Sequence, residues 1–254
     1  MKGFGAFFAK ELREIVSTWR IWVIPGMLVF FAVSSPFMAL LTPALVSSLA
    51  SSQPGVVIQL PDPTAADAFG QFLKNLSQIV LITVVISGAG AVSGERASGT
   101  AVLALTKPLS RGAFVVAKVL AEQLLLAGFT AATTLLTFGV TALVFEAPSP
   151  GPLIEAVALW LAFALLLVAV MTLCSVLFRS RGAAAGAGLG FLFLTLLLAT
   201  WPRIATSSFA GLLGAAGKAL AGQPVAPLWP LLTAAVAAVA ALATAVWAFQ
   251  RQEL

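Results

Sequence analysis

The sequence predicts an all-α, polytopic integral membrane protein with six transmembrane helices. Of its 254 residues, 60% are hydrophobic and only 9% are charged, whereas an average soluble domain is about half apolar and about a quarter charged. The charges also lie in short groups between long uncharged intervals, each at least as long as the roughly 20 residues that a helix needs to cross a bilayer. This composition excludes an ordinary soluble enzyme, a disordered tail and a nucleic-acid-binding module.

Six uncharged intervals mark the expected spans, which we place in a single transmembrane domain of residues 1–254. The first interval lies between Arg20 and Asp62. The other intervals run from Asn75 to Gly94, Gln123 to Phe145, Ala156 to Phe178, Gly182 to Pro202, and from Lys218 onward. The spans are therefore expected at about 21–46, 72–94, 119–145, 156–178, 183–201 and 228–249.

The distribution of positive charge predicts that both termini are cytoplasmic. Cytoplasmic loops of membrane proteins carry an excess of Lys and Arg. With the N-terminus inside, only Lys74, Arg203 and Lys218 of the 14 basic residues lie outside. The six tryptophans agree with this orientation, because each falls near a predicted membrane boundary, where tryptophan is enriched. The Ala-, Gly- and Leu-rich composition favours a bacterial plasma (inner) membrane.

Residues 1–20 are predicted to form an interfacial amphipathic helix. Lys10, Arg13 and Glu14 lie on one side of this helix, and apolar residues recur on the other at helical spacing. The apolar residues are Phe4, Phe8, Leu12, Ile15, Trp19 and Trp22. A helix of this kind lies along the membrane surface with its apolar face in the acyl boundary. It is either a simple anchor or a helix that also contacts a cytoplasmic partner.

The loop 95–111, between the second and third spans, is predicted to contain a short cytoplasmic helix. Glu95 and Arg96 close the preceding span at the water boundary, and Gly99 permits a sharp turn because it tolerates a positive φ. The residues that follow can form two helical turns, which Pro108 ends. A short connection needs no apolar helix of its own, so we expect this one to present a surface to a partner.

In this loop the sequence resembles the permease subunits of type-2 ABC exporters. The motifs that carry the resemblance are Gly94-Glu95-Arg96, Gly99-Thr100, Pro108-Leu109-Ser110-Arg111 and Lys118, in the family's order, with Lys10-Glu11-Leu12-Arg13-Glu14 near the N-terminus. The likeness is greatest to the short form without a fused ATPase, similar to the nitrous-oxide-reductase maturation permease group. The motifs lie within residues 1–120, and beyond them only the number and spacing of the spans agree.

This resemblance implies the transmembrane subunit of an ATP-driven exporter, which is not itself an enzyme and holds no cofactor or metal. It implies as partners two copies of an ABC ATPase subunit and a second copy of this chain in the lipid bilayer, and no nucleic acid. It also implies that the loop helix docks on the ATPase and couples ATP hydrolysis to transport. The residues to which it assigns this coupling are Glu95, Arg96, Gly99, Thr100, Leu103, Lys107, Pro108 and Arg111. For Glu95 and Arg96 the alternative is ordinary anchoring at the membrane boundary.

The fifth predicted span begins with three glycines, Gly182, Gly186 and Gly190, placed four residues apart. Small residues at this spacing let two helix backbones approach closely. The pattern therefore predicts helix packing, either within one chain or across a dimer interface.

Three other classes of protein are alternatives. An ion-coupled secondary transporter usually carries ionisable residues at mid-membrane, whereas the charge nearest to a predicted span core is Glu122, beside Lys118 at the inner boundary. A membrane enzyme would need clustered His, Cys or carboxylate side chains, and this chain has no His and one Cys, Cys174. A scaffold that moves nothing is the third alternative. The largely apolar interior favours a hydrophobic or amphipathic substrate, which the sequence does not identify.

Overall fold

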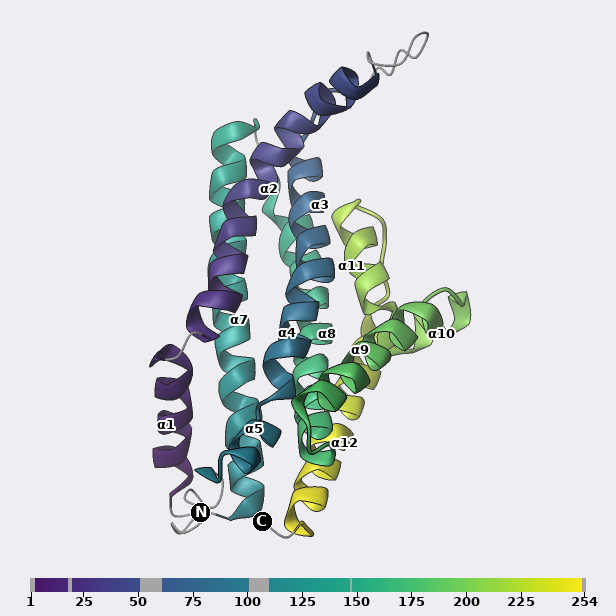
Figure 1. Cartoon of the computed structure of the whole chain (residues 1–254). Coiled ribbons are helices and arrows are strands. Elements are labelled where there is room, and N and C mark those ends of the chain that lie inside the picture. The colour runs from purple at the N-terminus through teal and green to yellow at the C-terminus, as the bar shows by residue number, and fades with distance from the viewer. Residues whose placement is uncertain (1–2, 18–19, 51–60, 101–109, 147, 253–254) are drawn as a thin grey trace.

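The computed structural model describes residues 3–17, 20–50, 61–100, 110–146 and 148–252. Every regular element within these ranges is a helix, which confirms the predicted all-α class. In chain order the helices are α1 (Phe4–Ser17), α2 (Arg20–Ala50), α3 (Ala65–Asn75), η1 (Leu76–Val80), α4 (Leu81–Ala89), α5 (Ser93–Ala97), α7 (Arg111–Val144), α8 (Pro150–Leu177), α9 (Arg181–Leu198), α10 (Pro202–Ser207), η2 (Phe209–Gly211), α11 (Leu212–Leu220) and α12 (Leu228–Gln250). They form a long bundle, and α1 begins and α12 ends at its lower end (Figure 1).

Six helical stretches of the described chain are long and apolar enough to cross a membrane, as predicted. They are Trp22–Ser48, Ala65–Ala97, Arg111–Val144, Pro150–Leu177, Arg181–Leu198 and Leu228–Gln250. The second and third extend past the uncharged intervals because polar caps start them outside the apolar run. Thr64 and Asp67 form a capping box before α3, and the Ser110 hydroxyl accepts the N–H of Ala113 (3.2 Å) at the start of α7.

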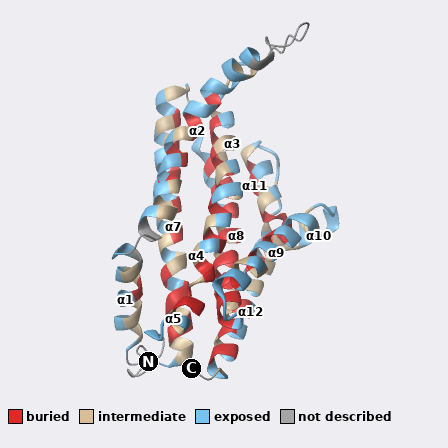
Figure 2. Cartoon of the chain, in the orientation of Figure 1, coloured by how far each residue is buried: buried red, intermediate tan, exposed pale blue. Residues whose placement is uncertain are grey.

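Helix α8 is the centre of the bundle. It contacts α4, α7, α9, α11 and α12, and its large side chains Trp160, Phe163, Leu167 and Met171 are fully buried. A helix that is apolar around its whole circumference has to be covered on all sides by protein or lipid. Figure 2 shows buried residues along α8, whereas α9 and α10 present mostly exposed and half-buried residues. The bundle is therefore built around the fourth span.

The second span is divided into four helical pieces. Helix α3 continues through the π-helical turn η1 into α4, and the chain then turns at Gly90 before α5 begins at Ser93. A π-helical turn is rare and often marks a functional position. The Ser175 hydroxyl on α8 accepts the N–H groups of Val92 (2.9 Å) and Ser93 (3.0 Å) and donates to the carbonyl of Ala89 (3.0 Å). One serine thus satisfies the backbone where the span is broken and holds α5 against α8.

Two glycines allow α4 and α9 to lie close to Met171 of α8. A methyl group at Gly88 would lie 2.8 Å from Met171 Cβ, and a methyl group at Gly188 would lie 3.1 Å from Val85 Cγ1. Carbon atoms in contact prefer separations of about 3.5–4.0 Å, so neither position accommodates a side chain without movement. These contacts fix how close the second, fourth and fifth spans come to one another.

The three glycines singled out in the sequence, unlike Gly88 and Gly188, do not lie in close contact with a neighbouring helix. Gly182, Gly186 and Gly190 have open space where a side chain would project. The glycine of α9 that is packed against the rest of this chain is Gly188. The role of the other three in packing within the described chain is therefore small, and an interface with a second copy stays a prediction.

Replacing Gly88 by alanine is expected to destabilise the bundle by about 1–3 kcal/mol, because the new methyl group overlaps the rigid Cβ of Met171. Gly128→Ala is the matched control, since Gly128 also lies inside a helix but has nothing within 4 Å of its added methyl group. This control is expected to match the wild type or exceed it slightly, because alanine is the better helix former. Thermal unfolding of the purified protein in detergent measures both, and equal loss of stability in the two variants would contradict the packing assigned to Gly88.

Candidate coupling site

A buried ion cluster joins α1, α5 and the start of α7, which lie at the lower end of the bundle (Figure 1). The ammonium group of Lys118 on α7 binds the carboxylate of Glu11 on α1 (Nζ to Oε2, 2.8 Å) and that of Glu95 on α5 (Nζ to Oε1, 2.5 Å). The side chains of Lys118 and Glu11 are 6% exposed, and that of Glu95 is 15% exposed. We refer to these three residues as the Lys118 cluster. It ties the N-terminal helix and the start of the third span to the residue at which the predicted coupling loop begins.

Charges that are buried this deeply depend on their partners, because removal of one leaves another uncompensated. A second lysine supports the cluster from the solvent side: Lys10 donates to Glu11 Oε1 (3.1 Å) and also forms an ion pair with Glu14. Burial lowers the pKa of Lys10, but the hydrogen bond to Glu14 and the charges of Glu11 and Glu95 outweigh this effect, so the pKa lies above its usual value. Lys10 therefore stays protonated at physiological pH.

An aromatic stack flanks the cluster on one side. Phe114 on α7 lies between Phe7 on α1 (5.2 Å between ring centroids) and Phe249 on α12 (5.3 Å). The ammonium group of Lys118 lies 5.1 Å from the centroid of the Phe114 ring, a distance at which the ring face attracts a cation. The stack excludes water from one side of the cluster and connects it to α12.

Arg96 makes a second connection, to the end of α8. Its guanidinium donates to the carbonyl of Val176 (3.1 Å), and the side-chain amide of Gln252 donates to the same carbonyl (3.0 Å). The last carbonyl groups of a helix have no partner within the helix and carry partial negative charge. Arg96 and Gln252 thus cap α8 and hold α5 and the end of α12 against it.

Arg111 makes a third connection, between the start of α7 and the end of α12. Its guanidinium donates to the carbonyl groups of Gln250 (3.1 Å) and Gln252 (2.7 Å). These bonds satisfy carbonyl groups at the C-terminus of α12. The two ends of the predicted loop, at Glu95 and Arg111, are therefore both bonded to neighbouring helices.

The remaining residues predicted for the coupling surface divide into two sets. Gly99 and Thr100 are exposed; Gly99 has a φ of +72°, as its predicted turn requires, and the Thr100 hydroxyl donates to the carbonyl of Glu95 (3.3 Å). Leu103, Lys107 and Pro108 lie outside the described residues. The structure thus brings Glu95, Arg96 and Arg111 into contact with the bundle and leaves Gly99 and Thr100 at its surface.

Glu11 and Ser175 are members of this site to which the sequence analysis assigned no coupling role, although Glu11 lies in the N-terminal motif. Glu11 has a recognisable signal, because helical spacing places it between Phe8 and Ile15 on the apolar face of the N-terminal helix. A carboxylate on such a face requires a buried partner. Ser175 has no comparable signal, since a serine within an apolar span also occurs as a simple packing residue.

The carboxylates of the site are also close enough together to suggest a metal ion. Oxygen atoms of Glu11, Glu14 and Glu95 lie within 4.8 Å of one another. The ammonium groups of Lys10 and Lys118, however, already bind these same carboxylates. These two lysines offset two of the three negative charges and occupy oxygen atoms of all three carboxylates, so we assign no metal ion to this group.

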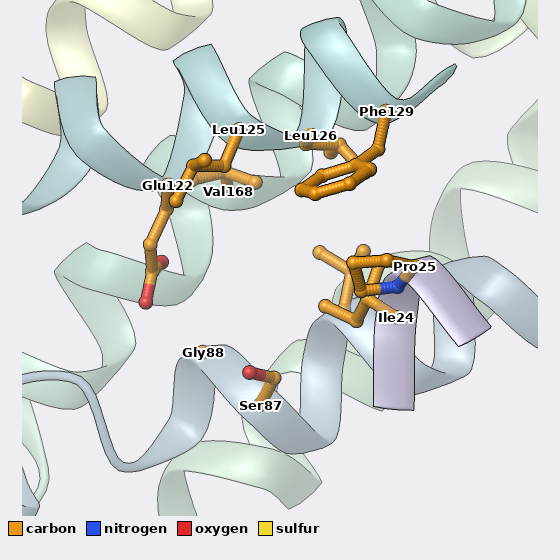
Figure 3. A pocket seen from close by; sticks show the side chains of 10 residues that line it. Ile24, Pro25, Ser87, Gly88, Glu122, Leu125, Leu126, Phe129 and Val168 are labelled. Carbon is orange, nitrogen blue, oxygen red and sulfur yellow. The ribbon is translucent and has the colours of Figure 1, made fainter. Parts of the chain in front are cut away.

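Glu122, one turn beyond Lys118 on α7, lines a separate small pocket. Figure 3 shows its carboxylate directed toward the part of α4 that carries Ser87 and Gly88 and away from Phe129. The pocket has a volume of about 60 Å³ and an otherwise mostly apolar lining. Such a volume has room for a few water molecules but not for a drug-sized molecule. The pocket therefore provides no evident path for a substrate.

Comparison with known proteins identifies the family. The sequence profile of a family described as "ABC-2 family transporter protein" matches residues 6–216, which include the Lys118 cluster and Arg111. The chain belongs to the ABC-2 transporter family. This ABC-2 permease is also similar to YxlG, an uncharacterized transmembrane protein of Bacillus subtilis (strain 168), with 22% identity over 183 residues that cover 72% of this chain and 71% of the relative.

Membership establishes the broad class that the loop motifs suggested. The chain is a multi-pass membrane component of an ABC-type transporter. The resemblance that the sequence motifs indicated is therefore confirmed at the level of the family. The ABC-2 permease carries its buried ion cluster where the predicted coupling loop leaves the bundle.

Proposed function

We propose that this ABC-2 permease is the transmembrane subunit of an exporter driven by a separate ATPase, with residues 95–111 as the coupling segment. The observation that carries the proposal is the bonding of Glu95, the first residue of this segment, through Lys118 to Glu11. Because the cluster is buried and fully paired, α1, α5 and α7 move as a unit when the segment is displaced. A partner that grips the loop can thus move two membrane helices at once.

Arg96 and Arg111 extend this connection to the fourth and sixth spans. Arg96 bonds to the end of α8, and Arg111 bonds to the end of α12. Packed cores resist continuous deformation, so a movement at the loop is passed on as a movement of whole helices. In this proposal the two arginines act inside the permease, and the exposed Gly99 and Thr100 form part of the surface that meets the ATPase.

The proposed assembly contains two permeases and two ATPases. A closed pair of identical subunits uses the same surface on both copies. The exposed face of α9 suits this role, because the open positions at Gly182, Gly186 and Gly190 lie beside the exposed side chains of Leu189 and Phe193. We propose this face as the permease–permease interface.

The finer assignment follows the sequence motifs. We propose a permease of the short form without a fused ATPase, similar to the nitrous-oxide-reductase maturation group, in a bacterial plasma membrane with both termini cytoplasmic. The exposed apolar residues of α2 and α9 are consistent with contact with lipid or a second copy. The proposed cargo is hydrophobic or amphipathic, and the proposed direction is export.

The coupling assignment is tested by co-expressing the permease with each stand-alone ABC ATPase encoded in the genome from which it comes. Glu95→Ala and Arg111→Glu are each expected to weaken co-purification or to lower the ATPase activity that the permease stimulates, by about fivefold, equivalent to a coupling change of about 1 kcal/mol. Both variants are expected to insert into the membrane normally, because neither position lies within an apolar core.

Arg179→Glu is the matched control for charge at the same end of the bundle. Arg179 is exposed between α8 and α9 and lies outside the proposed coupling segment. The control is expected to co-purify and stimulate as the wild type does. Unchanged stimulation by both Glu95→Ala and Arg111→Glu would refute the coupling assignment, and failure to recover any ATPase would favour a scaffold.

A further inference from the structure

A cavity of about 650 Å³ opens between α1, α4, α5 and α9 at the lower end of the bundle. We refer to it as the lower cavity. It is lined by Glu11, Glu14, Ile86, Ser87, Ala89, Gly90, Ala91, Gly94, Glu95, Ser98, Thr100, Arg181, Gly182 and Ala185. Its volume falls within the range of ordinary small-molecule sites. Because α4 and α9 belong to spans, the cavity lies at one boundary of the membrane.

The two ends of this lining carry opposite charge. Glu14 of α1 and Glu95 of α5 contribute carboxylates, and the lysines that bind these carboxylates are not part of the lining. On the other side, Arg181 at the start of α9 contributes a guanidinium group. The cavity therefore presents a dipolar surface, because three carboxylates share two lysines on the side of α1 and α5, and α9 contributes a cationic group.

The position of Arg181 depends on glycines. A methyl group at Gly94 would lie 2.7 Å from Arg181 Nη2, and a methyl group at Gly90 would lie 3.3 Å from Nε. The guanidinium thus lies directly on the backbone between α4 and α5. Among the described residues no ion pair or hydrogen bond involves its side chain, whereas Arg96 and Arg111 both donate to carbonyl groups. Its donors are available to a ligand in the cavity.

An apolar track leads out of the cavity along the second span. Ile86 lines the cavity and is 60% exposed, and Ile82 (43%) and Ile79 (38%) follow on the same face toward the middle of the bundle. A polar cavity at the membrane boundary, continued by an apolar track within the membrane, matches the polar headgroup and the apolar chain of an amphiphile.

We propose that the lower cavity binds the headgroup of a zwitterionic phospho-amine lipid, of the phosphatidylethanolamine type. The phosphate lies at Arg181, because a guanidinium matches the planar pair of phosphate oxygens. The amine lies toward Glu14 and Glu95, and an acyl chain follows Ile86, Ile82 and Ile79. A headgroup with a phosphate but no amine meets the carboxylates unfavourably, and an amine without a phosphate leaves the guanidinium unmatched.

The test uses the purified full-length permease in detergent without any ATPase, so that its result is independent of the proposed coupling. Native mass spectrometry is used to count bound palmitoyl-oleoyl phosphatidylethanolamine and, separately, phosphatidylglycerol with the same chains. The ethanolamine lipid is expected to bind about tenfold more tightly than the glycerol lipid. Arg181→Gln is expected to lower the affinity for the ethanolamine lipid about tenfold. Equal binding of the two lipids would overturn the proposal.

Two variants and one free headgroup complete the test. Arg179→Gln, which removes an exposed arginine outside the cavity, is expected to bind within about twofold of the wild type. Gly94→Ala keeps every charge but displaces the guanidinium of Arg181, and is expected to weaken binding as Arg181→Gln does.

Free phosphoethanolamine is expected to compete only weakly with the lipid, because it lacks the acyl chain. Competition as strong as that of the lipid would overturn the role of the apolar track. Unchanged affinity in Arg181→Gln, with a normal gel-filtration profile, would overturn the site.

Discussion

Lys118→Met is expected to lower the stability of the permease by about 3–5 kcal/mol and to abolish its stimulation of the ATPase. The substitution keeps most of the side-chain volume but leaves Glu11 and Glu95 buried without the ammonium group that bonds to both. Removing one partner of a buried ion pair is costly because the remaining charge is uncompensated. Thermal unfolding in detergent measures the first effect, and ATPase activity of the reconstituted complex measures the second.

Two further variants test whether the loss of stability comes from the buried, uncompensated charge. Lys10→Met removes a lysine that is 49% exposed, and we expect a loss of no more than about 1 kcal/mol. Combining Lys118→Met with Glu11→Gln and Glu95→Gln removes all three charges, so much of the stability is expected to return. If Lys118→Met were as stable as the wild type, or no less stable than Lys10→Met, the cluster would have no structural role.

Ser175→Ala is expected to cost about 2–4 kcal/mol, a large effect for the loss of one oxygen atom. The hydroxyl accepts two backbone N–H groups at the break between α4 and α5, and alanine leaves both of them buried and unsatisfied. Each buried donor without a partner costs about 1–3 kcal/mol. Because this break positions α5 and therefore Glu95, we also expect ATPase stimulation to fall.

Thr172→Val is the matched control one turn earlier on α8. The Thr172 hydroxyl is also buried, but it donates only to the carbonyl of Val168 in its own helix (3.0 Å), and valine has the same shape. We expect its stability to change by less than about 1 kcal/mol, since no donor of another helix loses its partner. Similar losses in Thr172→Val and Ser175→Ala would show that the hydrogen bonds to Val92 and Ser93 are unimportant.

The contacts that the proposed coupling residues make could be predicted from the sequence only in part. The order of motifs around Glu95, Arg96 and Lys118 pointed to one functional segment, and the structure brings these residues to the lower end of the bundle. The motifs did not show that Arg96 bonds to the end of α8. That contact joins residues about 80 positions apart, and no local pattern records which carbonyl group lies opposite a given arginine.

Glycines illustrate the same limit. Spacing singled out Gly182, Gly186 and Gly190, yet the residue of α9 that is packed within the chain is Gly188. Helical spacing identifies residues that share a face, but it does not say which face turns toward the core. Only the arrangement of Met171 and Val85 around α9 decides that question.

The sequence by itself determined the all-α membrane class and the number of spans, because both follow from the length of apolar intervals and the cost of placing charge in lipid. Only the tertiary structure decided that Glu11, Glu95 and Lys118 meet, that Ser175 bridges the broken second span, and that Arg181 faces a cavity. Hydropathy is a sum over neighbouring residues, whereas an ion pair or a cavity depends on how distant helices are rotated and packed against one another.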